Sequence, residues 1–93
     1  MYPRLESDPK ILYALAHACH GMKDPARARP LFEQVLRRTS EPDPVAGSFL
    51  MLGRMAREQN DIEYSRRCWR LALEVEGVDA GLRRDIEEEL RKP

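Results

Sequence analysis

No stretch of the sequence approaches the roughly 20 consecutive apolar residues that a membrane-spanning helix requires. The first residues, Met1–Glu6, carry no apolar segment that would direct secretion. Cysteine is scarce as well, because the 93 residues include only two, and both fall at apolar positions of a helical pattern. We interpret them as free thiols in a reducing compartment. These observations predict a cytoplasmic protein with no membrane partner.

Net charge and aromatic content are also low. Sixteen basic residues balance sixteen acidic ones, so no overall field draws in nucleic acid or anionic lipid. Arginines do gather locally, at Arg37–Arg38 and at Arg66, Arg67 and Arg70. They lack an interleaved set of aromatic residues for base stacking, so nucleic-acid binding is only a remote alternative.

Motifs for catalysis or metal binding are missing too. The sequence has no glycine-rich phosphate loop, no nucleophile elbow and no histidine with an evident acid partner. The run Glu87–Glu89 consists of successive helical positions that point in different directions. His17 and His20 share a helix face, but Cys19 lies about 160° round the helix from His17, and two histidines alone underfill a zinc site. We expect neither an enzyme nor a bound metal or cofactor.

Helix-starting signals are frequent along the chain. Asp-Pro pairs at residues 8–9, 24–25 and 43–44 each offer an N-cap followed by proline at the first helical position. Between these signals apolar residues recur with the spacing of an amphipathic helix, and no segment alternates like a strand. Pro30 is expected to bend the second helix or delay its start. We therefore predict an all-α domain of about five helices, at residues 9–21, 25–38, 44–58, 62–75 and 80–91.

The sequence nearly repeats itself at an offset of 37 residues, so that Leu12 corresponds to Phe49 and Leu15 to Leu52. Residues at the same positions of the two copies are expected to share packing roles. Other matched pairs are Ala16 with Gly53, Ala28 with Ser65, Phe32 with Trp69, and Asp24 with Asp61. Periods of this size are typical of stacked helical arrays, which hold other molecules on their surfaces.

Each copy resembles a tetratricopeptide repeat, a pair of antiparallel helices of roughly 34 residues. Small residues such as Ala16 and Gly53 stand where that family needs close helix approach, and Phe32 and Trp69 stand where a large wedge fills the space between helices. The resemblance implies a single domain, residues 1–93, built as an α-α superhelix of helical hairpins. Its parts are repeat 1 at about 9–42, repeat 2 at about 46–79 and a capping helix at about 80–91.

The two ends of this array differ in the sequence. The last segment has a narrow apolar stripe of Leu82, Ile86 and Leu90 on an otherwise charged helix, which is typical of a terminal cap. The first helix has no such cap, and two repeats are fewer than the three or so that usually give independent stability. We therefore expect either self-association or an origin as part of a longer array, with exposed apolar residues at Leu50, Met51 and Met55.

The resemblance also implies where a ligand would bind, because these arrays hold peptides on the concave face lined by the first helix of each pair. Independently, helical spacing places one ridge at Lys10, Tyr13, His17 and His20, and another at Arg54 and Arg57. The residues expected to bind peptide are Lys10, Tyr13, His17, His20, Leu50, Arg54, Arg57 and Arg83. Because this groove is mostly basic, we expect an acidic peptide or a terminal carboxylate, bound by an adaptor, scaffold or chaperone-like module. The plain alternative is that these side chains form ordinary solvated helix surface.

Overall fold

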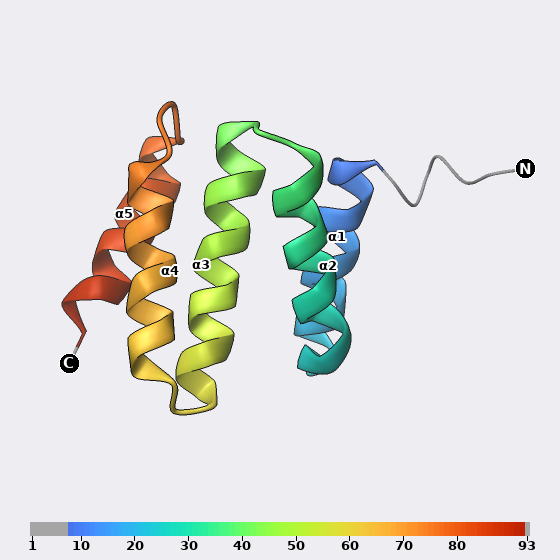
Figure 1. Ribbon diagram of the computed structural model, residues 1–93, viewed down its shortest axis with the longest axis horizontal. Coiled ribbons are helices and arrows are strands. Elements are labelled where there is room, and N and C mark those ends of the chain that lie inside the picture. Colours follow the sequence, from blue (N-terminus) through green and yellow to red (C-terminus); the bar gives the residue numbers. More distant parts are fainter. Residues whose placement is uncertain (1–7, 93) are drawn as a thin grey trace, which may run out of the picture.

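The computed structural model describes residues 8–92 (Figure 1). They form five α-helices: α1 (Pro9–Gly21), α2 (Pro25–Arg38), α3 (Pro42–Glu58), α4 (Ile62–Glu74) and α5 (Ala80–Arg91). The predicted all-α fold with about five helices is confirmed. Helix α3 begins at Pro42 rather than at residue 44, because Pro42 and Pro44 both fit in a first turn whose N–H groups have no intrahelical partner.

Proline within α2 neither delays nor interrupts the helix. Pro30 lies on the exposed side of α2, which begins at Pro25 and continues to Arg38. The expectation that Pro30 delays the start of the helix is therefore wrong. The helix already begins at Pro25, because the Asp24 carboxylate caps its first turn by accepting the N–H of Arg27.

The two hairpins have the same connecting turn. Lys23 between α1 and α2 has a φ of 61°, and Asn60 between α3 and α4 has a φ of 69°. After each of them, an aspartate N–H bonds back to the preceding helix, from Asp24 to the Cys19 carbonyl and from Asp61 to that of Ala56. The backbone conformation of the turn thus repeats after 37 residues, as the sequence does.

The helices form two layers. Figure 1 shows α1 behind α2 and α5 behind α4, with the first hairpin at one end of the molecule and α5 at the other. Within each hairpin the two helices pack closely, and α2 then packs on α3 while α4 packs on α5. Lighter contacts join α1 to α3 and α3 to α5. Helices α1, α3 and α5 therefore present a common surface, which we call the α1/α3/α5 face.

The core is divided between the two hairpins. Phe32 is fully buried where α2 meets α1 and α3, and Trp69 is buried with Ile86 where α4 meets α3 and α5. The Trp69 indole N–H donates a hydrogen bond to the Leu50 carbonyl oxygen at 3.1 Å. The two aromatic residues correspond in the repeat, and each fills the space between its hairpin and the following helix.

Two expectations about exposure are wrong. Leu50, Met51 and Met55 are buried, because α3 is the middle helix: Leu50 packs with Trp69 and α5, whereas the two methionines pack with the first hairpin. Leu15 does not share the packing role of Leu52, since Leu15 is 46% exposed and Leu52 only 3%. The reason is position in the stack, because α2 covers α3 while α1 is the first helix.

Candidate functional site

An aromatic cluster occupies the α1 part of the α1/α3/α5 face. The rings of Tyr13 and His17 meet edge to face with centroids 4.5 Å apart. Both also pack edge to face on Phe32, at 6.1 Å and 5.2 Å respectively. Burial raises the pKa of Tyr13, and the nearby charge of Asp43 adds to the effect. Tyr13 and His17 therefore form an apolar surface with polar ends. They lie on one ridge of α1, as the sequence predicts.

Glycine on α3 makes room for this cluster. A Cβ atom at Gly47 would overlap the Tyr13 hydroxyl, so the tyrosine lies directly over the glycine backbone. Gly47 is buried, and its lack of a side chain lets α1 and α3 approach each other beneath the ring.

Replacement of Gly47 by alanine should move the Tyr13 ring away from α3. Because the overlapping atom is the end of a flexible side chain and alanine favours helix, we expect the stability to change by less than about 1 kcal/mol. The ring-current shifts of the His17 protons should change in NMR spectra. Unchanged His17 shifts would show that Tyr13 does not lie over Gly47.

The histidines border the charged part of the face. Burial lowers the pKa of His17, and the positive charges of His20 and Arg54 lower it further. His20 Nε2 lies 4.0 Å from a carboxylate oxygen of Glu58 on α3. The structure thus brings His17 and His20 together with α3, whereas the exposed Lys10 lies at the start of α1.

An ion-pair cluster joins α3 to α5. Arg54 Nε donates to Glu89 Oε2 at 2.8 Å, and Arg57 Nη1 lies 2.6 Å from Glu89 Oε1. The latter is a close ion pair without aligned hydrogen-bond geometry. Lys92 Nζ is 3.5 Å from the same carboxylate, and the Arg57 guanidinium lies over the Trp69 ring at 5.2 Å. Three cations therefore surround one carboxylate.

Glu89 is charged although its side chain is only 5% exposed. Burial alone raises the pKa of this carboxyl, but hydrogen bonds and charges from Arg54 and Arg57 outweigh burial, so the net pKa lies below its ordinary value. The side chains of Arg54 and Arg57 remain 35% and 33% exposed. The cluster can therefore still meet a ligand from solvent.

Two of the expected binding residues lie elsewhere. Leu50 is buried against Trp69 and offers no open contact on this face. Arg83 is half-buried, and its Nη2 donates to the Leu73 carbonyl oxygen at the end of α4, at 3.5 Å. Its guanidinium is thus directed to α4 rather than to Arg54 and Arg57.

Sequence reasoning missed Glu89, which it placed in a charged surface run. A signal was present, because Glu89 lies seven residues after Leu82 and three after Ile86. Those are positions of the buried stripe of α5. A charged residue within an apolar stripe indicates a paired, buried charge.

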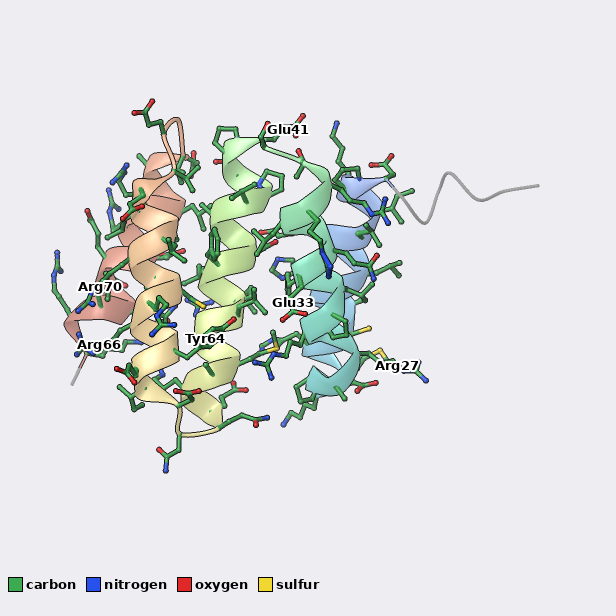
Figure 2. All side chains as sticks on the ribbon, viewed as in Figure 1. Arg27, Glu33, Glu41, Tyr64, Arg66 and Arg70 are labelled. Carbon is green, nitrogen blue, oxygen red and sulfur yellow. The ribbon has the colours of Figure 1, made fainter. Side chains whose placement is uncertain are left out.

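Among residues 8–92, the opposite side of the molecule holds no second buried carboxylate like Glu89. A shallow cavity of about 330 Å³ lies between α2 and α3, with Leu52 and Met55 among its lining residues. Figure 2 shows Tyr64 reaching from α4 towards α2, where Arg29 lies over its ring at 5.9 Å. In Figure 2, Arg66 and Arg70 extend from α4 on the side that points away from α2.

Comparison with known proteins adds no identity to this geometry. Neither models of protein families nor searches of curated proteins and solved structures give a match to the chain. Within residues 8–92 no helix has the length and apolar character that crossing a membrane requires. The same residues contain no group of three or more His, Cys, Asp or Glu placed to hold a metal ion.

Proposed function

We propose that the chain is a tetratricopeptide-like interaction module that binds a peptide on its α1/α3/α5 face, as an adaptor or scaffold in the cytoplasm rather than as an enzyme. The observation that supports this most is the contact of Glu89 with Arg54 and Arg57. The chain places its own carboxylate between two arginines that remain partly open to solvent. The same donors suit a carboxylate presented by another molecule.

Charge and shape both favour an acidic ligand. Arg54, Arg57 and Lys92 carry three positive charges against the single negative charge of Glu89, so the cluster keeps an excess of positive charge. The planar guanidinium groups suit carboxylates better than a point charge would. Tyr13 and His17 lie on the adjoining helix and provide an apolar surface for the rest of the peptide.

Titration with acidic peptides tests this proposal. The variant Arg54→Gln/Arg57→Gln/Glu89→Gln removes both arginine charges together with the charge of Glu89, and Lys92 is exposed, so that no buried charge is left unpaired. We expect it to lose at least about tenfold in affinity for a short peptide rich in aspartate and glutamate, which corresponds to about 1.4 kcal/mol. The wild-type affinity should also fall as salt is added.

Arginines on α4 provide the matched control. Arg66→Gln/Arg70→Gln removes two charges that are not among the ion-pair partners of Glu89 within residues 8–92, and it should leave peptide affinity unchanged. Equal affinity of the wild type and the triple variant would overturn the proposed site. Binding of single-stranded oligonucleotides that the α4 variant abolishes would favour the nucleic-acid alternative instead.

A further inference from the structure

The ion-pair cluster around Glu89 holds more positive charge than its one carboxylate balances. Nitrogen atoms of Arg54, Arg57 and Lys92 lie 2.8, 2.6 and 3.5 Å from the Glu89 oxygens. Within residues 8–92 neither Arg54 nor Arg57 has a second acidic partner. Three positive charges therefore meet a single negative one, and the excess of two is available to a ligand.

Each guanidinium also keeps donors that Glu89 does not occupy. Arg54 gives its Nε to Glu89, and its Nη1 lies 3.8 Å from the Met51 sulfur. Arg57 places only Nη1 against the carboxylate. Among the described residues, no acceptor forms a hydrogen bond with Arg54 Nη2 or with Nε and Nη2 of Arg57. Because both side chains are partly exposed, these N–H groups can reach a group that arrives from solvent.

The two guanidinium groups are held in place before a ligand arrives. Arg57 lies over the Trp69 ring at 5.2 Å, and the buried Trp69 is itself fixed by its hydrogen bond to the Leu50 carbonyl. Arg54 is held by Glu89 and by its contact with Met51. Binding therefore costs less side-chain entropy than it would at freely moving surface arginines.

We infer that this cluster receives the phosphate group of a phosphorylated serine or threonine in a peptide, an inference that rests on the peptide-binding function proposed above. Such a phosphate carries about 1.5 to 2 negative charges at neutral pH and three acceptor oxygens. It balances the two excess positive charges, whereas a glutamate leaves one of them unbalanced. Its three oxygens also suit donors from two guanidinium groups better than a second carboxylate does.

The surroundings of the cluster favour a phosphate within a peptide over a free one. Burial lowers the pKa of His17, and the charges of His20 and Arg54 lower it further, so that His17 lies near the cluster. Its ring meets that of Tyr13 edge to face. These rings provide an apolar surface for the residues that flank the phosphate, which inorganic phosphate cannot use.

Glu89 and Lys92 set the preference for phosphate in opposite directions. The Glu89 carboxylate repels a phosphate and already occupies one side of both guanidinium groups. The attraction depends on the excess of positive charge, so removal of one cation should reduce the preference for phosphoserine over glutamate. Lys92 is suited to this test because its side chain is 56% exposed, and its replacement should leave the fold intact.

Calorimetric titration with three peptides tests the inference. The peptides share one otherwise uncharged sequence and carry serine, glutamate or phosphoserine at its centre. The wild-type chain should bind the phosphoserine peptide at least about tenfold more tightly than the glutamate peptide, and the serine peptide most weakly. Lys92→Gln should reduce the ratio of phosphoserine to glutamate affinity about threefold. Arg70→Gln is the control, because it removes one exposed positive charge from α4 and should leave this ratio unchanged.

The results separate this inference from the proposed function. Equal affinity for the glutamate and phosphoserine peptides would overturn the inference, while binding of peptides rich in aspartate and glutamate would still stand. A preference for phosphoserine that persists in Arg54→Gln/Arg57→Gln/Glu89→Gln would also overturn it, because the phosphate would then bind elsewhere. A chain that binds no acidic peptide of either kind would contradict the proposed function itself.

Inorganic phosphate and a single-stranded oligonucleotide distinguish the source of the phosphate. Each should bind at least about tenfold more weakly than the phosphoserine peptide, because neither presents flanking residues to Tyr13 and His17. If either of them bound as tightly as the phosphoserine peptide, the assignment to a phosphorylated peptide would be wrong.

Discussion

Replacing Glu89 with glutamine should lower the free energy of unfolding by about 1–3 kcal/mol at neutral pH. Removing one partner of a fully buried ion pair costs about 3–5 kcal/mol, because the other charge is left without a counterion. Here Arg54 and Arg57 are 35% and 33% exposed, so water replaces part of the lost contact. The contact also holds α5 on α3, and its loss should loosen the last helix first.

Urea unfolding followed by circular dichroism measures this effect. Glu88→Gln is the control, because Glu88 is the neighbouring residue of α5 and is exposed to solvent. It should leave the unfolding midpoint unchanged. Equal midpoints for Glu88→Gln and Glu89→Gln would show that the arginines do not depend on Glu89.

The contribution of Glu89 should depend on pH with a definite sign. Its pKa in the folded chain lies below its ordinary value of 4.5, so the unfolded chain binds more protons in this range. The stabilisation is therefore complete above about pH 4.5 and is lost as the pH falls through the folded pKa. The difference in stability between wild type and Glu89→Gln should shrink as the pH is lowered below 4.5. A difference that stays constant down to pH 2–3 would contradict the ion pair.

The same variant links stability to the proposed function. Without the carboxylate of Glu89, the guanidinium groups of Arg54 and Arg57 have no acidic partner on α5. If the cluster binds acidic peptides, Glu89→Gln should bind them more tightly than the wild type does, although it is less stable. A loss of stability without a gain in affinity would mean that the cluster serves packing alone.

Local features of the fold could be predicted because they depend on neighbouring residues. The Asp24 N-cap and the helix that follows it require only the sequence of that segment. The contact between Tyr13 and His17 follows from their i, i+4 spacing on one helix. Such features do not change with the position of the helix in the stack.

Features that depend on position in the stack could not be predicted in this way. Leu15 and Leu52 occupy the same place in the two repeats, yet only Leu52 has a preceding hairpin to cover it. Leu50 likewise seemed free on the helical pattern of α3, whereas α5 and Trp69 cover it. Glu89 was assigned to the surface because of its charge, and only the packing of α5 on α3 reveals its two arginine partners.

Gly53→Ala should be the most damaging single methyl addition in the fold, with a cost of about 2–4 kcal/mol. A Cβ atom at position 53 would overlap the Trp69 indole ring, which lies directly on the glycine backbone. Trp69 is 2% exposed and cannot swing into solvent without leaving the core. Its shift would also break the hydrogen bond to the Leu50 carbonyl and leave a buried N–H unpaired. The gain in helix propensity, about 1 kcal/mol, is smaller than these losses.

Gly21→Ala is the control for Gly53→Ala, because it adds the same methyl group to a helix at a position with no neighbouring side chain. A Cβ atom at Gly21, the last residue of α1, meets nothing within 4 Å. This variant should be neutral or slightly more stable than the wild type. Thermal unfolding of both variants, together with the hydrogen-exchange rate of the Trp69 indole N–H, measures the contrast. If Gly53→Ala unfolded at the same temperature as Gly21→Ala with an equally protected indole, Trp69 would not rest on Gly53, and the packing of α4 against α3 would have to be different.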